Sequence, residues 1–243
     1  MIVFDKVVFA RGNRTILDGV SFSIAFDERV AVLGGSGEGK TTILSLIIGL
    51  QRPDSGIIRI GNDILNDKSE EELQKIRRSF AVVFQQGALF DSMTVGDNIA
   101  FPLREAGMND PVKLEEKVRK LLGTVGVEHA IEYMPEELSG GMRRRVSIAR
   151  ALATERSKMF LYDEPTADLD PVNAEIIRNI INDLSSHGRG FIIVTHSVSD
   201  ALLTAQRFLF LEKGSIVVDG NESSLKNVQK ESVKKFVEQA LKY

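Results

Sequence analysis

The sequence predicts an α/β fold in which a parallel sheet is interrupted by a helical insertion. Apolar runs of strand length alternate with amphipathic helical patterns, as expected of a parallel sheet covered by helices. This β signal fades after residue 85 and resumes at 158, and helical patterns occupy the interval. We expect a single domain, 1–243, consisting of a core (1–85 and 157–220), a helical segment (86–156) and a C-terminal helix (221–243).

The elements of the first half follow from apolar periodicity. A strand at 29–33 runs into glycine-rich sequence and then into an apolar helical pattern, which is a strand-loop-helix unit. The other expected elements before the helical segment are strands at 2–9, 20–26, 57–60 and 80–84 and a short polar helix at 70–77.

The second half repeats the alternation after the helical segment. Two helices are expected within that segment, at 111–123 and 140–153. After it come strands at 158–162 and 191–195, a helix around 173–184, and a hairpin over 208–219. The final polar helix carries a loose apolar stripe formed by Val228, Val233, Phe236, Val237 and Leu241.

Composition excludes several kinds of site. The 243 residues include no cysteine, which removes disulfides, thiolate metal sites and thiol nucleophiles. The formal net charge of −3 provides no basic field, so we expect no nucleic acid partner. Apolar runs are far shorter than the roughly 18 residues of a membrane span, and the N-terminus lacks a signal-peptide pattern. We expect membrane work only through a partner.

A phosphate-binding loop follows the strand at 29–33. Its pattern, G-x-x-x-x-G-K-[ST], turns backbone N–H groups towards phosphate oxygens; the lysine reaches the β and γ phosphates, and the threonine hydroxyl binds Mg²⁺. The strand before and the helix after argue against a chance glycine-rich turn, and we expect Glu38 to point outward. The candidate ligands of Mg-ATP are Gly34, Gly35, Ser36, Gly37, Glu38, Gly39, Lys40, Thr41 and Thr42.

Two acids end the apolar strand at 158–162, which places them at the carboxyl edge of the sheet beside the phosphate loop. We expect Asp163 to join the Mg²⁺ shell and Glu164 to polarise the attacking water. His196 emerges from the next strand at the same edge, where it can contact the γ-phosphate or orient the water. Alone, an Asp-Glu pair at a strand end is usually only solvated.

The run Leu138-Ser139-Gly140-Gly141-Met142 opens the helix at 140–153 and resembles the signature motif of the ABC (ATP-binding cassette) ATPases. The remaining motifs occur in the family's order: Gln85 resembles its Q-loop glutamine, residues 167–170 its D-loop, and His196 its switch histidine. This resemblance implies a RecA-like P-loop NTPase core with an N-terminal antiparallel β subdomain and an inserted helical subdomain. It also implies that Gln85 acts in catalysis and contacts Mg²⁺.

A head-to-tail dimer is implied by the same resemblance. Glycines and a serine at a helix N-terminus form a second anion site, which serves the ATP held by another copy of the chain. The residues expected to contact nucleotide across this interface are Ser139, Gly140, Gly141, Met142 and Asp170.

Two positions depart from the family pattern. Met142 stands where glutamine is usual, and Arg11 stands where an aromatic ring commonly stacks on adenine. A planar guanidinium can stack on adenine as well. Phe9 is an alternative for this contact, and Arg11 can equally be a plain surface residue.

The stretches 83–95 and 98–104 are similar to the Mla/Mce branch of bacterial ABC ATPases. That resemblance implies a motor on the cytoplasmic face of the inner membrane, beneath a permease pair that handles phospholipid or another lipid, with a small regulatory subunit as a further possible partner. Ala88, Leu89, Phe90 and Met93 are either the permease docking surface or core.

Three alternatives to a lipid transport motor stay open at this point. The chain can serve a transporter of another substrate, or it can be a soluble ABC protein acting on ribosomes or DNA. The latter class favours tandem cassettes, a coiled-coil insert or basic extensions, none of which the sequence contains. A P-loop kinase is disfavoured by the signature, D-loop and switch histidine together. The run Arg143-Arg144-Arg145 is expected to be a solvated or internally paired helix face.

Overall fold

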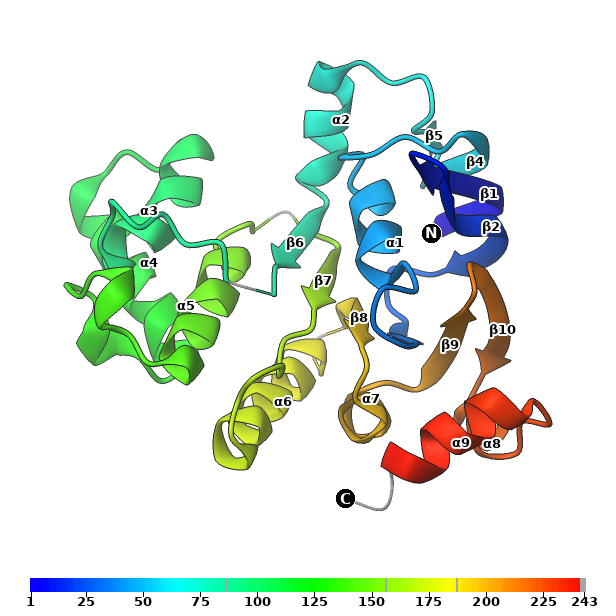
Figure 1. Cartoon of the computed structure of the whole chain (residues 1–243). Coiled ribbons are helices and arrows are strands. Elements are labelled where there is room, and N and C mark those ends of the chain that lie inside the picture. The colour runs from blue at the N-terminus through cyan, green and yellow to red at the C-terminus, as the bar shows by residue number, and fades with distance from the viewer. Residues whose placement is uncertain (86, 156, 187, 241–243) are drawn as a thin grey trace.

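The structure is a computed structural model, and it describes residues 1–85, 87–155, 157–186 and 188–240. Its larger sheet has the order β10-β9-β3-β8-β7-β6 (Figure 1). All neighbouring pairs are parallel except β10 with β9. The strands are β3 (Arg29–Leu33), β6 (Phe80–Val83), β7 (Met159–Asp163), β8 (Gly190–Thr195), β9 (Arg207–Glu212) and β10 (Ser215–Gly220).

An antiparallel sheet of order β2-β1-β4-β5 forms the other β layer (Figure 1). Its strands are β1 (Ile2–Arg11), β2 (Arg14–Ile24), β4 (Ser55–Ile60) and β5 (Asp63–Ile64). Helix α1 (Lys40–Ile47) lies between this layer and the larger sheet, and α2 (Glu70–Arg77) borders the same core. The sequence analysis expected the strands at 57–60 and 80–84 but not the two-residue β5.

Alternation along the central strands divides the interior into two cores. Val30 and Val32 of β3 pack with α1 and the antiparallel sheet, whereas Ala31 and Leu33 pack with the core on the opposite face. This follows from the two-residue period of a strand. Both faces of β3 are buried over residues 30–33, which is why these four residues are a continuous apolar run.

Three helices form the helical segment at one end of the molecule (Figure 1): α3 (Val95–Glu105), α4 (Pro111–Thr124) and α5 (Gly140–Leu152). Each begins at a capping side chain, since Thr94, Asp110 and Ser139 accept backbone N–H bonds from their first turns. Helix α3 is not among the helices expected from the sequence. Its Pro102 interrupts the helical pattern, yet buried Asn98 fixes the preceding loop by donating to the carbonyls of residues 90, 93 and 94.

The remaining helices cover the sheet and its C-terminal edge: α6 (Pro171–Ser185), α7 (Val198–Thr204), α8 (Glu222–Lys226) and α9 (Glu231–Ala240). The expectation of one helix over 221–243 was wrong, because α8 ends at Lys226, with Asn227 as its C-cap, and a separate helix, α9, begins at Glu231. Val233 and Val237 are buried in the same core, and Phe236 packs edge-on against Phe210.

Residues 241–243 and the segment limits 86 and 156 lie outside the described residues. No described helix combines the length and the apolar character needed to cross a bilayer.

Candidate functional site

The loop between β3 and α1 has the shape of a phosphate cradle. Gly37 and Gly39 adopt left-handed backbone, with φ of 76° and 104°, which favours glycine at both positions. A Cβ atom at Gly34 would lie 2.4 Å from the Leu211 carbonyl oxygen, so the approach of β9 also requires glycine there. No side chain in the described part of the chain caps the N-terminus of α1. Its first N–H groups are therefore left to an anion, as a bound polyphosphate requires.

Lys40 lies at the centre of this cradle. Its ammonium donates to the carbonyl oxygens of Gly34 and Gly35, both at 2.9 Å, and lies 3.8 Å from Glu164 Oε1. The side chain is 6% exposed, and this burial lowers the pKa of Lys40 although Glu164 opposes the effect. A phosphate placed in the cradle would add a second counter-charge, beside Glu164, to this desolvated ammonium.

The expected Mg²⁺ ligands lie side by side. Thr41 Oγ1 donates to Asp163 Oδ1 at 3.0 Å, and Thr41 and Gln85 line one cavity, which is described below. Burial raises the pKa of Asp163, and the Thr41 hydrogen bond partly offsets this. No cluster of three or more His, Asp or Glu side chains in the described part of the chain can hold a metal alone. The arrangement fits Mg²⁺ held jointly by one carboxylate, one hydroxyl and nucleotide phosphates.

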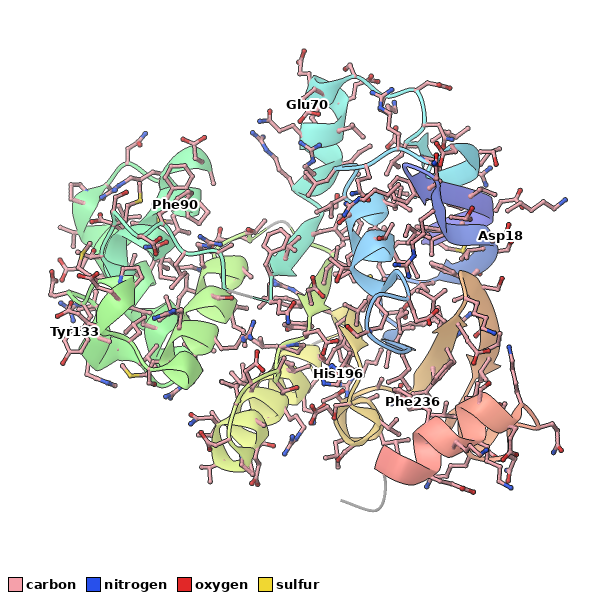
Figure 2. The ribbon with its side chains drawn as sticks, in the orientation of Figure 1. Asp18, Glu70, Phe90, Tyr133, His196 and Phe236 are labelled. Carbon is pink, nitrogen blue, oxygen red and sulfur yellow. The ribbon has the colours of Figure 1, made fainter. Side chains whose placement is uncertain are left out.

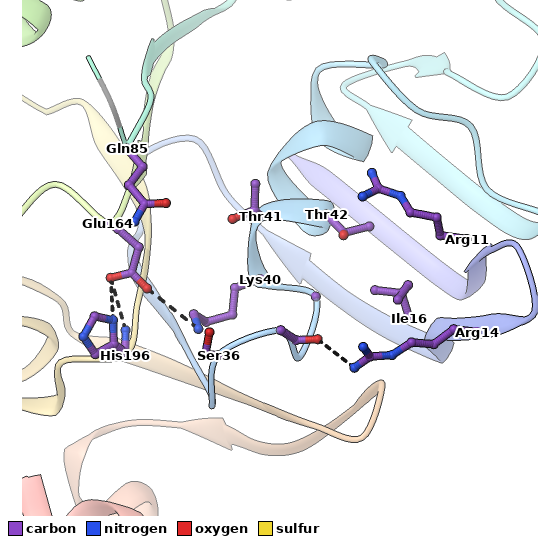
Figure 3. Close-up of a pocket in the computed structure, with 12 residues that line it drawn as sticks. Arg11, Arg14, Ile16, Ser36, Lys40, Thr41, Thr42, Gln85, Glu164 and His196 are labelled. Atoms are coloured by element: carbon purple, nitrogen blue, oxygen red, sulfur yellow. Dashed lines mark hydrogen bonds and ion pairs between the residues drawn. The ribbon is translucent and has the colours of Figure 1, made fainter. Parts of the chain in front are cut away.

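Glu164 and His196 form a pair at the edge of the cavity (Figure 3). His196 Nδ1 lies 3.0 Å from Glu164 Oε2, and the His196 backbone N–H donates to the same oxygen at 3.4 Å. Glu164 is buried, with φ of 46°, and its own N–H donates to the Val194 carbonyl. Two neighbouring strands, β7 and β8, thus fix the carboxylate beside Lys40 (Figure 3).

Lys40, Thr41, Gln85, Glu164 and His196 line one cavity of about 630 Å³, and Asp163 adjoins it through its hydrogen bond with Thr41. Arg11 lines it from the end of β1, and Arg14 and Ile16 of β2 line it as well (Figure 3). Arg14 Nη2 also donates to the Gly37 carbonyl at 3.2 Å. The sequence analysis missed Arg14 and Ile16, although their place in the hairpin next to Arg11 was a usable signal.

Glu38 points away from the phosphate cradle. Its Oε2 accepts the backbone N–H of Lys213 at 2.5 Å, which ties the loop to the turn between β9 and β10. Glu38 therefore holds the loop and does not face the phosphates, in agreement with the outward orientation expected from the sequence.

The signature residues lie elsewhere. Ser139 Oγ accepts the Met142 N–H at 3.2 Å, and Met142 packs its half-buried side chain against the core. Asp170 caps α6 by accepting the N–H groups of Val172 and Asn173. None of Ser139, Met142 and Asp170 is among the described residues that line the 630 Å³ cavity. Within one chain these three residues are thus separate from the phosphate cradle.

Comparison with known proteins decides the family. The family model described as ABC transporter matches residues 17–167, more than half of the chain. The chain belongs to the ABC transporter ATP-binding family. It is 38% identical to the glutamine transport ATP-binding protein GlnQ of Escherichia coli K12, over 98% of the chain and 99% of that protein. It is 36% identical to the intermembrane phospholipid transport ATP-binding protein MlaF of the same strain, over 96% of the chain and 86% of that protein.

Solved ABC cassettes share the fold. A dimeric post-hydrolysis state of the cassette MJ0796, bound to ADP and Pi, superposes with a TM-score of 0.84. The two sequences are 31% identical, and the match covers 91% of this chain and 98% of that one. The cassette described here binds ATP with Mg²⁺ and hydrolyses it in a reaction coupled to transport. ABC cassettes dimerise and pair with membrane permease components.

Proposed function

We propose that this cassette forms a homodimer on the cytoplasmic face of a bacterial inner membrane and powers a permease that moves phospholipid or a related lipid. The observation that carries the permease contact is an apolar groove of about 420 Å³ between β6 and the helical segment. Phe84, Phe90 and Phe101 line it with exposed fractions of 38%, 42% and 40%. Figure 2 shows Phe90 on the helical segment.

Contacts among the side chains that line the groove hold them in place, so the groove can receive a helix. Phe90 and Phe101 pack edge to face with centroids 5.2 Å apart, and the Arg150 guanidinium lies 5.5 Å from the Phe90 ring. Ala88 lines the groove, whereas Leu89 packs against the core and Met93 is only half-buried. Residues 88–93 therefore contribute both to the proposed docking groove and to the core. A short amphipathic helix of a permease fits such a groove.

Similarity supports lipid as the cargo. MlaF, the ATP-binding protein of an intermembrane phospholipid transport system, is 36% identical to this chain over 96% of its length. A second candidate is an amino-acid transporter, which the 38% identity to GlnQ over nearly the whole of both proteins favours. The 35% identity to the methionine import ATP-binding protein MetN of Brucella abortus favours the same candidate. In either case the permease, not this chain, handles the cargo.

The dimer assigns roles to both anion sites. Each ATP lies between residues 34–42 of one subunit and Ser139 to Met142 of its partner, with Asp170 near the interface. Glu164 polarises the attacking water, His196 holds the Glu164 carboxylate through the 3.0 Å contact, and Gln85 contacts Mg²⁺ and the water. Arg11 stacks on the adenine from the β1–β2 hairpin.

The cargo is tested by purifying the cassette with its membrane partners and reconstituting the complex in vesicles. ATP-dependent transfer of a fluorescent phospholipid is expected, and it should be lost with Glu164→Gln. Radiolabelled glutamine and methionine are assayed in parallel. Uptake of either amino acid without lipid transfer would show that the lipid assignment is wrong.

The docking groove has a matched control. Phe90→Glu should abolish co-purification of the permease while isolated cassettes still hydrolyse ATP. Tyr133→Glu, at a side chain that is also 42% exposed on the helical segment (Figure 2), should leave co-purification intact. Equal retention of the permease by both variants would place the contact elsewhere.

A further inference from the structure

Arg144 of helix α5 is an almost fully buried cation, with 7% of its surface exposed. Its Nη1 donates to the carbonyl oxygen of Phe84 at 3.0 Å and to that of Gln85, and its Nη2 donates to the carbonyl of Ala167 at 3.5 Å. One guanidinium therefore connects the helical segment to two loops that border the nucleotide cavity. The first carries Gln85, and the second follows Glu164.

Arg150, six residues further along α5, binds the rest of the same loop. Its guanidinium donates to the Ala88 carbonyl at 2.7 Å and to the Gly87 carbonyl at 3.3 Å. Both Gly87 and Ala88 have left-handed backbone, with φ of 76° and 47°. Such backbone is costly for alanine and persists where surrounding contacts impose it. Arg144 thus holds the backbone at residues 84 and 85, and Arg150 holds the left-handed residues 87 and 88.

The charge of Arg144 has no carboxylate partner at ion-pair distance among the described residues. Burial lowers the pKa of Arg144, although Asp168, Asp163 and Glu164 oppose the effect from a distance. A buried cation is costly, and a neutral side chain would fill the same space at lower cost. What the guanidinium adds is several donors in a fixed planar geometry, which hold several carbonyl groups at once.

We infer that Arg144 is a positioning residue that holds Gln85 at its working position in the nucleotide cavity and couples that position to α5. Gln85 lines both the nucleotide cavity and a second cavity of about 550 Å³, which Arg144 and Gly140 also line. A shift of α5 therefore moves the backbone that carries Gln85. Ser139 caps the same helix five residues before Arg144, about 7.5 Å along the axis.

This inference rests on the proposed dimer in one respect. Ser139 is proposed to bind the ATP of the partner subunit, so engagement of that ATP shifts α5 and, through Arg144, adjusts Gln85 in the other site. Each site thereby senses whether its neighbour holds nucleotide. The positioning of Gln85 within one chain is independent of the permease and of the cargo.

The test uses the full-length isolated cassette and the variants Arg144→Gln, Arg144→Lys and Arg145→Gln. Arg145 is the matched control, because it lies next to Arg144, donates to the Gly126 carbonyl and is not among the described residues that line either cavity. We expect Arg144→Gln to lower kcat about 10- to 100-fold, as for a small misplacement of a reacting group. The KM for ATP should stay within about twofold, and the Mg²⁺ concentration for half-maximal rate should rise.

A double-mutant comparison separates positioning from simple stability. If Arg144 acts through Gln85, Arg144→Gln should cost little further activity in a Gln85→Ala background. Additive losses, or an unchanged Mg²⁺ requirement with normal kcat, would overturn the inference. Arg144→Lys keeps the charge but lacks the planar donor set, so its kcat should fall between those of the parent and Arg144→Gln. It is the variant to compare with the parent if Arg144→Gln folds poorly. A failure of lipid transport would leave all these readouts unaffected.

Discussion

The replacement Tyr162→Phe should stabilise the protein. Tyr162 lies in β7, fully buried, stacked on Phe160 with centroids 5.6 Å apart and edge-on to Phe191 at 5.9 Å. Its hydroxyl is buried and has no hydrogen-bond partner among the described residues. Phenylalanine keeps both ring contacts and removes only the hydroxyl.

The expected gain follows from two opposing terms. A buried hydroxyl without a partner costs about 1–3 kcal/mol, which the variant recovers. The oxygen leaves a small void, whose cost is about 1 kcal/mol or less because only a few atom contacts of about 0.1–0.2 kcal/mol each are lost. We expect a net gain of about 1 kcal/mol. In a domain of this size that raises Tm by about 2–4 °C.

Alkaline pH provides a second test of the effect of Tyr162 on stability. Burial raises the pKa of the Tyr162 hydroxyl above its ordinary value of 10, so the folded protein keeps a proton that the unfolded chain releases. Above pH 10 the unfolded state therefore binds fewer protons, and stability falls by up to about 1.4 kcal/mol per pH unit from this group. The phenylalanine variant lacks this contribution, so its advantage over the parent should grow as pH rises.

Urea unfolding at neutral and alkaline pH measures both effects. Tyr133→Phe is the control, because Tyr133 is 42% exposed at the outer end of the helical segment (Figure 2). Its change in unfolding free energy should stay within about 0.5 kcal/mol. A Tyr162→Phe variant less stable than the parent would refute the reasoning, since it would mean that the hydroxyl is hydrogen-bonded.

Three further predictions concern the site and its frame. Glu164→Gln should still bind ATP in a filter-binding assay, while its turnover, measured as phosphate release, falls about 10²- to 10⁴-fold. Normal turnover would exclude Glu164 as the group that polarises water. Gly190→Ala should lower the free energy of unfolding by about 1–3 kcal/mol or more, because its Cβ would lie 2.3 Å from the Glu28 carbonyl oxygen; calorimetry showing parental Tm would contradict this. Lys213→Gly should raise the free energy of unfolding by a few tenths to about 1 kcal/mol in urea titrations, because Lys213 has φ of 48°; a loss would show that its side chain stabilises the turn.

The sequence predicted those parts of the fold whose pattern is local. The strand at 29–33 and the helix at 70–77 match β3 and α2. Residues 30–33 form an apolar run of strand length, and α2 begins at a Ser69–Glu72 capping box. Helix α3 was missed because Gly96 and Pro102 weaken its intrinsic preference, and packing within the helical segment determines it instead.

The site was predictable to the extent that motifs specify backbone. Residues 34–42 cradle a cavity because glycines and the start of α1 require it, and the carboxyl ends of β7 and β8 bring Glu164 and His196 together. Long-range contacts were not predictable. Of the run 143–145, expected to be solvated or internally paired, Arg144 pairs internally with backbone carbonyls that are about 60 residues away in sequence.

The helical segment joins two strands that are hydrogen-bonded neighbours, β6 and β7. A parallel pair needs a crossover between its strands, and α5, which leads directly back to β7, serves as that crossover. The two preceding helices, α3 and α4, are thus an enlargement of one loop rather than a separate building block. Such an enlargement can change length or sequence in related chains while strand order stays the same, so a cassette can acquire a new membrane partner without rebuilding its nucleotide site.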